Sequence, residues 1–242
     1  MSEVRAEVER LGRHTVIRLT GELTVATAPV VRTALTKCLV ERPEALVADL
    51  SGLTAPEPHA LTVFRAVIRQ AALWPGTPML LCAPDPSLTA LLTKGGHGRR
   101  VFRSLAEALA APAAPRLATV SDVLLPVTGA SRQARAVATS ACEQWELPHL
   151  AAPAALVAGE LATNAVTHAG TLADLRLTRG HRYLMIAVRD GSTAPPRMAA
   201  GPSPDPAAPR GLLLVDATAH RWGSLTADGG KVVWATLPLA AP

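Results

Sequence analysis

Aromatic residues are scarce in this 242-residue chain, where Phe, Trp and Tyr together make up 3% of the sequence. Hydrophobic residues of all kinds nevertheless reach 49%, so we expect folded cores built from Ala, Val and Leu, and not a disordered polymer. Long apolar runs are absent too, because Arg, Asp, Glu or Pro interrupts every stretch of about 18 residues that could span a membrane. The amino-terminal MSEVRAEVERLGRH is polar and carries no segment typical of a signal peptide. We therefore expect a cytoplasmic protein without a membrane partner.

Cysteine is also rare, with three residues at Cys38, Cys82 and Cys142. They are far apart and odd in number, which suits neither a disulfide framework nor a zinc site. The sequence predicts buried, reduced thiols.

An excess of one charge is nearly absent, since 24 basic and 19 acidic residues leave a net charge of +5. The densest basic stretch, TKGGHGRRVFR, contains a single aromatic residue, Phe102. A surface that stacks nucleic-acid bases needs several aromatic side chains among its charges. We therefore expect a solvated turn here and no direct nucleic-acid partner.

The sequence divides at an alanine- and proline-rich segment, AAPAAPRLA, which lacks hydrophobic periodicity. A chain of this length accommodates two domains. We predict one domain over residues 1–112, a linker over 113–118 and a second domain over 119–242.

The first half alternates between strand and helix patterns, which favours a sheet covered by helices. HTVIRLTGEL, ALVADL and PMLLCAP have the composition of strands. The predicted helical stripes are Ala28/Val31/Leu35/Leu39 and Leu61/Phe64/Ile68/Ala71, and a last helix begins at a capping box formed by Ser104 and Glu107.

The segments GELTVATAP and VADLSGLT, with the helix–strand units behind them, resemble the STAS domain of anti-sigma-factor antagonists over about residues 3–112. The resemblance implies a mixed sheet covered by helices. Two positions depart from the family. Thr24 replaces an Asp, and Glu57, Pro58, His59 and Ala60 replace the segment whose Ser accepts phosphate. The usual phosphorylation switch is therefore not expected, and His59 is either a phosphate acceptor or, more simply, an exposed loop residue.

The second half predicts a two-layer α/β sandwich with mostly antiparallel strands. One helix carries Ala134, Val137, Ala141 and Trp145. A second helix follows LPHLAAP, runs through AALVAGELATNAVTHAG and ends at Gly170. The remaining predicted elements are the strands SDVLLPV, ADLRLTR and YLMIAVRD, the helix GLLLVDATAHRWG and a hairpin that turns at DGG before KVVWATLPL.

Three polar side chains share one face of the second helix, because Glu160, Asn164 and His168 are each four residues apart. A carboxylate in such a place can accept the proton of an attacking hydroxyl. An amide oxygen can complete the coordination of a magnesium ion held otherwise by phosphate and water. A polar helix face alone is more often merely solvated.

Two further segments carry chemistry in this half. Asp190, Gly191 and Ser192 end a predicted strand, where a carboxylate can accept a hydrogen bond from the amine of adenine and a glycine lets the base approach. Gly211 opens a helix after a proline-rich stretch, and free amides at a helix start bind phosphate. Each segment alone is typical of a plain turn or a helix boundary.

Together these segments resemble the asparagine box and the glycine boxes of histidine-kinase-like ATPases, most closely the anti-sigma-factor serine kinases, over about residues 119–240. The resemblance implies a Bergerat-type ATP-binding fold with ATP and Mg²⁺ as cofactors. It implies Glu160 as the general base and Asn164 as the metal ligand. The residues it implies for nucleotide binding are Asn164, His168, Asp190, Gly191, Ser192, Arg210, Gly211 and Leu212. Pro209 and Val232 depart from the family, where a Gly and a Thr are common.

The function that we predict is regulation of transcription by partner switching, through a serine/threonine kinase that acts on an anti-sigma-factor antagonist. The alternative is a non-catalytic ATP-binding or degenerate module that sequesters a sigma factor or a STAS-domain partner. A third hypothesis is a scaffold that pairs with STAS-like proteins. Sigma factors and antagonist proteins are the expected partners, and homodimerisation stays open.

Overall fold

The computed structural model describes residues 3–83, 85–94, 100–112, 115–196 and 211–240. It divides into two compact units, Met1–Pro115 and Arg116–Pro242. In the first unit the elements are β1 (Arg5–Leu11), β2 (His14–Glu22), α1 (Ala28–Val40), β3 (Ala45–Thr54), η1 (Pro58–Leu61), α2 (Thr62–Leu73), β4 (Met79–Cys82), α3 (Pro86–Leu92), β5 (Val101–Phe102) and α4 (Leu105–Ala110). In the second they are β6 (Ala118–Leu124), α5 (Ala130–Gln144), α6 (Pro148–Ala169), β7 (Ala173–Arg179), β8 (Tyr183–Asp190), α7 (Gly211–Thr218), β9 (Arg221–Ala227) and β10 (Gly230–Pro238).

The sheet of the first unit is mixed, as predicted, with its described strands in the order β1-β2-β3-β4-β5. β1 pairs with β2 in antiparallel orientation, and the other neighbours are parallel. The prediction missed β1, because four of its seven residues are charged and this edge strand is exposed along nearly its whole length.

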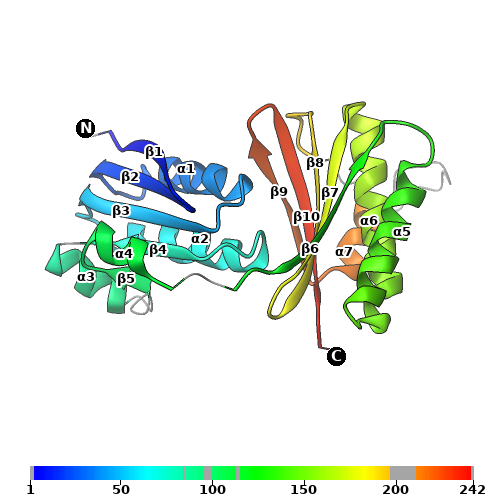
Figure 1. Cartoon of the computed structure of the whole chain (residues 1–242). Coiled ribbons are helices and arrows are strands. Elements are labelled where there is room, and N and C mark those ends of the chain that lie inside the picture. The colour runs from blue at the N-terminus through cyan, green and yellow to red at the C-terminus, as the bar shows by residue number, and fades with distance from the viewer. Residues whose placement is uncertain (1–2, 84, 95–99, 113–114, 197–210, 241–242) are drawn as a thin grey trace. The chain divides into compact units, whose positions relative to one another are not determined.

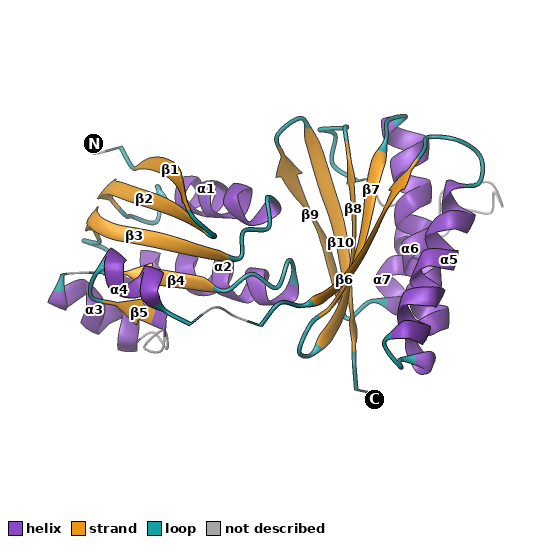
Figure 2. Cartoon of the chain, in the orientation of Figure 1, coloured by secondary structure: helices purple, strands orange, loops and turns teal. Residues whose placement is uncertain are grey.

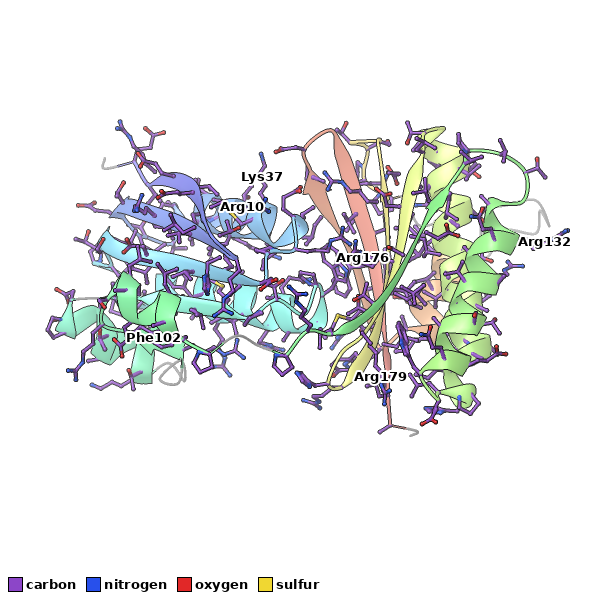
Figure 3. The ribbon with its side chains drawn as sticks, in the orientation of Figure 1. Arg10, Lys37, Phe102, Arg132, Arg176 and Arg179 are labelled. Atoms are coloured by element: carbon purple, nitrogen blue, oxygen red, sulfur yellow. The ribbon has the colours of Figure 1, made fainter. Side chains whose placement is uncertain are left out.

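Helices cover both faces of this sheet (Figure 1). α1, α2 and α3 pack on one face through a core that includes Leu35, Phe64 and Leu88. α4 covers the other face, where a smaller cluster contains Cys82 and Ala108. Phe102, labelled in Figure 3, packs against this second cluster, so the single aromatic residue of the basic stretch is a packing residue.

The predicted cap of α4 is confirmed in a modified form. The Ser104 hydroxyl accepts a hydrogen bond from the Glu107 amide at 3.1 Å. The Glu107 carboxylate in turn accepts the amide of Arg103 at 2.9 Å, one residue before the cap. Both bonds satisfy amides at the helix start that have no partner inside the helix.

The second unit is the predicted two-layer sandwich. Its sheet is antiparallel throughout the described strands, in the order β6-β7-β8-β10-β9. α5, α6 and α7 lie on one face of that sheet (Figure 2). Arg132 lies on the side of α5 away from the sheet (Figure 3).

The core of this unit is largely aliphatic, and small side chains bring its helices together. Ala130, Ala134, Ala138 and Ala141 form a buried stripe on α5, the helix that packs most extensively on α6. α6 also contacts α7, β7, β8 and β10. Among the described helices, α6 alone is long and apolar enough to span a membrane by length and composition, but half of its apolar window is buried inside this core.

Two predicted helix boundaries are wrong. The sequence predicted that the second helix follows LPHLAAP, whereas α6 begins at Pro148 and contains Pro153. The sequence also predicted a helix through GLLLVDATAHRWG, whereas α7 ends at Thr218 and β9 begins at Arg221. His220 donates its amide to the Thr236 carbonyl on β10, and Arg221 then pairs with Thr236 in the sheet. Pairing with β10 therefore overrides the helical pattern at the end of this segment.

Candidate nucleotide site

Glu160 lies on α6, and the environments of its two carboxylate oxygens differ. Oε1 accepts a hydrogen bond from Nη2 of Arg135, on α5, at 3.1 Å. Oε2 lies beside the first residue of α7, so close that a Cβ added to Gly211 would be 2.7 Å from it. The Glu160 side chain is 15% exposed, whereas that of Arg135 is 49% exposed. The carboxylate is thus fixed between two helices and still reachable from solvent.

Gly159 makes room for this ion pair. A Cβ at Gly159 would lie 2.9 Å from Cγ and 3.1 Å from Cδ of Arg135, and closer still to its Nε. The Arg135 side chain therefore crosses α6 directly over Gly159 to reach Glu160. A larger residue at position 159 would displace it.

Asn164 lies one turn further along α6 and is 8% exposed. Its side-chain amide makes no hydrogen bond to another residue in the part of the chain that the structure describes. His168, one turn beyond, is exposed, and α6 ends just after it at Gly170 in the left-handed conformation. Glu160, Asn164 and His168 therefore do lie on consecutive turns of one helix. The Asn164 carboxamide in the middle is buried, and the His168 imidazole at the end is exposed.

Asp190 ends β8 and is 3% exposed. Its Oδ1 accepts two hydrogen bonds, from Nζ of Lys231 and from the amide of Ser192, both at 2.8 Å. Lys231 Nζ also donates to the Ser192 carbonyl at 3.3 Å. The Lys231 side chain is 4% exposed and that of Asp190 is 1% exposed, so this ion pair is buried.

The other oxygen of the same carboxylate, Oδ2, is buried and has no hydrogen-bond partner among the described residues. Leaving a buried charged acceptor without a donor is costly, and such atoms usually mark a place where a ligand or water donates. The exocyclic amine of adenine is a donor of the required kind. The residues present therefore fit an adenine nucleotide.

Glycines at the end of β8 keep this region compact. The Gly191 amide donates to Oγ1 of Thr171 at 2.9 Å, and a Cβ at Gly191 would meet the Thr171 side chain at 3.0 to 3.3 Å. A Cβ at Gly230 would collide with the carbonyl oxygen of Asp190 and lie 3.0 Å from Cα of Gly191. The loop after α6 and the start of β10 are thus both fixed against the strand end that carries Asp190.

Two of the remaining predicted residues, Gly211 and Leu212, begin α7. Gly211 is its first residue, whereas Leu212 is 6% exposed and belongs to the apolar core. Arg210 lies outside the described residues. The catalytic and nucleotide-binding roles of all the predicted site residues remain predictions, and the core position of Leu212 gives it a packing role in addition.

The structure therefore brings Glu160 to Gly211, and Asp190 to Ser192 and Lys231. Three residues of this region, Arg135, Lys231 and Thr171, were not among the predicted site residues. Lys231 follows the predicted hairpin turn at the start of β10. In the structure β10 pairs with β8, and this register places Lys231 opposite Asp190. A sequence prediction that included this pairing would have found Lys231. Arg135 carries no comparable sequence signal.

Metal binding at this site needs partners beyond the protein. Within the described ranges, no three His, Cys, Asp or Glu side chains lie together in a way that could hold a metal ion. Asn164 and Glu160 supply two oxygen-bearing side chains, one turn apart. Mg²⁺ commonly binds to few protein groups and completes its coordination with water and substrate phosphates.

The first unit presents a separate feature at the loop where the sequence lacks a phosphate acceptor. Glu57 reaches across to the β2–α1 loop and accepts the Val25 amide at 2.9 Å. Pro58 and His59 follow in η1, and both are exposed. His59 is thus an exposed residue, as the simpler of the two interpretations predicted.

Comparison with known proteins gives one match for each half of the chain. Residues 5–108 match the STAS domain, and residues 127–237 match the histidine kinase-like ATPase domain. No curated protein matches the chain.

Solved structures similar to part of the chain include an anti-sigma factor antagonist from Mycobacterium paratuberculosis, at 24% identity and a TM-score of 0.40, over 45% of this chain and 93% of that one. The anti-sigma factor antagonist SpoIIAA in its unphosphorylated form is similar at 18% identity and a TM-score of 0.37, over 43% of this chain and 93% of that one. The Bacillus cell fate determinant SpoIIAA in the phosphorylated form is similar at 18% identity and a TM-score of 0.35, over 43% of this chain and 96% of that one.

Proposed function

Because the chain joins a STAS domain to a histidine kinase-like ATPase domain, we propose that it is an ATP-dependent serine/threonine protein kinase that regulates transcription by partner switching. The observation that carries the proposal is the buried Oδ2 of Asp190, which has no donor among the described residues. An adenine amine would supply that donor.

In this proposal the second unit binds Mg-ATP through residues of several elements. Asp190 accepts the adenine amine, and Gly191 and Ser192 form the turn beneath the base. Gly211 opens α7, whose free amides favour phosphate. Asn164 supplies an amide oxygen to Mg²⁺. When bound, the metal neutralises charge on the phosphates and polarises them for transfer.

Glu160 is the general base of the proposal. Its carboxylate accepts the proton of a Ser or Thr hydroxyl as that oxygen attacks. Nη2 of Arg135, 3.1 Å from Oε1, holds the carboxylate in position. The 15% exposure of the Glu160 side chain leaves it accessible to a substrate from another protein.

The substrate class is an anti-sigma-factor antagonist in another chain, and the STAS domain of this chain is not the target. Glu57, Pro58, His59 and Ala60 offer no hydroxyl where that family accepts phosphate. The expected setting is cytoplasmic.

A second candidate is a non-catalytic module that binds ATP or a partner without turnover and sequesters a sigma factor. Val232 favours it, because this buried residue of β10 lacks the hydroxyl that would support the adenine through water. The intact Glu160 and Asn164 favour the kinase.

Transfer of radiolabelled phosphate from ATP to purified STAS antagonists separates the two candidates. The kinase proposal predicts transfer by the full chain and a rate roughly 10²- to 10⁴-fold lower for Glu160→Ala, because a general base contributes about that much. The variant should keep nearly the same ATP affinity, which titration calorimetry checks. Binding of ATP without transfer to any antagonist would favour sequestration, and equal rates in both proteins would remove Glu160 from the mechanism.

A further inference from the structure

Lys231 is a buried ammonium at the edge of the proposed base site. It lies at the start of β10, directly opposite Asp190 in the β8–β10 register. The residue is 3% exposed, although lysine almost never occurs fully buried without a partner. Burying such a pair is expensive, and an apolar replacement is often as stable, so stability alone is a weak reason for the pair to be there.

The hydrogen bonds of Asp190 are distributed unequally between its two oxygens. A carboxylate oxygen has two acceptor positions. Both positions of Oδ1 are occupied, one by Lys231 Nζ at 2.8 Å and one by the Ser192 amide at 2.8 Å. Oδ2 has no donor, and it is the one carboxylate oxygen in that condition within the described residues.

Lys231 also fixes the direction in which the carboxylate points. Its ammonium group bridges Oδ1 of Asp190 and the Ser192 carbonyl, at 2.8 and 3.3 Å. The strand end and the turn after it are therefore held by one cation. With Oδ1 anchored in this way, Oδ2 is the single acceptor left to a ligand.

We propose that Lys231 is a positioning residue. By occupying Oδ1 of Asp190, it leaves only Oδ2 to accept a hydrogen bond from a purine base, and so selects adenine over guanine. The inference rests on the proposed function, since it assumes that Asp190 faces a nucleotide. Adenine presents one donor group on its pairing edge, the 6-amino group, beside an acceptor nitrogen. Guanine presents two adjacent donors, N1–H and the 2-amino group. A carboxylate accepts both hydrogen bonds, one with each of its oxygens. Occupation of Oδ1 by Lys231 removes the second oxygen from that pairing.

Competition binding to the full-length protein tests this with three nucleotides in the presence of Mg²⁺: ATP, GTP and purine riboside triphosphate, which lacks the 6-amino group. We expect the wild-type protein to bind ATP roughly ten- to a hundredfold more tightly than either of the others, the range for a hydrogen bond to a charged group. In Lys231→Met, Oδ1 becomes available and the carboxylate is no longer anchored. The ratio of ATP to GTP affinity should therefore fall at least about tenfold.

Thr236→Val is the matched control. Thr236 is a fully buried residue of the same strand, but its hydroxyl donates to the Arg221 carbonyl on β9 and not to Asp190. It should leave the ATP to GTP ratio unchanged, and circular dichroism verifies that both variants fold. A purely structural ion pair would change stability in Lys231→Met without changing the ratio.

The competition experiment distinguishes a failure of base selection by Lys231 from a failure of nucleotide binding. Wild-type protein that binds ATP and GTP equally, or a Lys231→Met variant that keeps the wild-type ratio, overturns the inference and leaves nucleotide binding intact. If Lys231→Met does not fold, the wild-type comparison decides alone. Wild-type protein that binds none of the three nucleotides overturns the proposed function, and the inference with it.

Discussion

Glu160 shows how one carboxylate can be held by two elements at once. Oε1 is bonded to Arg135 on α5, and Oε2 lies against Gly211 at the start of α7. For the general-base role that we propose, a carboxylate fixed before the substrate arrives avoids the entropic cost of ordering it in the transition state. The arrangement depends on two glycines, Gly159 beneath the arginine and Gly211 beside the carboxylate.

The cysteines show the opposite situation, in which burial suppresses chemistry. Burial raises the pKa of Cys38 to about 11, and burial together with the nearby Asp49 and Glu107 carboxylates raises the pKa of Cys82 to about 11. Burial also raises the pKa of Cys142. All three are free thiols, as predicted.

We predict that none of the three thiols reacts stoichiometrically with a disulfide reagent in the native protein at about pH 8, because the thiolate is the reactive form. The sign follows from the raised pKa values, which keep the thiols protonated until the pH approaches their folded-state range. Absorbance at the reagent's product wavelength measures the reaction. The protein denatured in guanidinium is the control and should release three equivalents, and rapid labelling of a native thiol would contradict the burial.

At the scale of elements, the contact between α6 and α7 brings Glu160, the proposed general base, next to the start of α7, where we propose that the phosphates bind. α7 begins at Gly211, and a Cβ there would lie 2.7 Å from Glu160 Oε2 and 3.6 Å from Glu160 Cβ. The Glu160 carboxylate cannot simply rotate away, since Oε1 is bonded to Arg135. The start of α7 therefore sets where the base lies.

Gly211→Ala should slow phosphoryl transfer by about 10²-fold, the cost of a misplacement of about 1 Å. Its free energy of unfolding should change by less than about 1 kcal/mol, since alanine favours a helix. The antagonist-phosphorylation assay and denaturant unfolding measure the two quantities. Leu214→Ala, at a residue of the same helix that is 43% exposed, should leave transfer unchanged. Wild-type transfer by Gly211→Ala would show that the contact does not position Glu160.

Local patterns predicted most elements, because they depend on residues close together in the sequence. The helical periodicity of α6 predicted the common face of Glu160 and Asn164, and the left-handed Gly170 ends that helix as predicted. Arg135 and Lys231 could not be predicted in the same way. Arg135 is 25 residues from Glu160 and Lys231 is 41 residues from Asp190, so packing and strand register decide these contacts.

At the scale of the whole molecule, each unit has its own apolar core and its own sheet. The first unit has no hydroxyl at Glu57, Pro58, His59 or Ala60, and the nearby hydroxyls donate hydrogen bonds within the unit. Thr54 donates to the Gly21 carbonyl at 3.4 Å, and Thr62 donates to the His59 carbonyl at 2.8 Å. Glu57 binds the Val25 amide and contributes a fixed charge. We infer that this unit acts through its surface independently of phosphorylation.

Incubation of the full chain with Mg-ATP and a related kinase should therefore leave residues 54–62 unmodified. Phosphorylation of a serine in this loop would add roughly −1.5 to −2 charges and could act as a switch. Residues 54–62 contain no serine. Mass spectrometry of the peptide measures the occupancy, with a STAS antagonist that retains the serine as the positive control. Stoichiometric phosphate on any residue from Thr54 to Thr62 would contradict a phosphorylation-independent role.

Thermal unfolding of the full chain in Mg-ATP tests the central claim, that the second unit is a nucleotide site built around Asp190. At a ligand concentration a hundredfold above its Kd, the account predicts a gain of about 2.7 kcal/mol in the free energy of unfolding of that unit. Asp190→Ala should lose this gain, because it removes the acceptor for the adenine amine. An unchanged unfolding transition of the wild-type protein in millimolar Mg-ATP, or an equal gain in Asp190→Ala, would contradict the account.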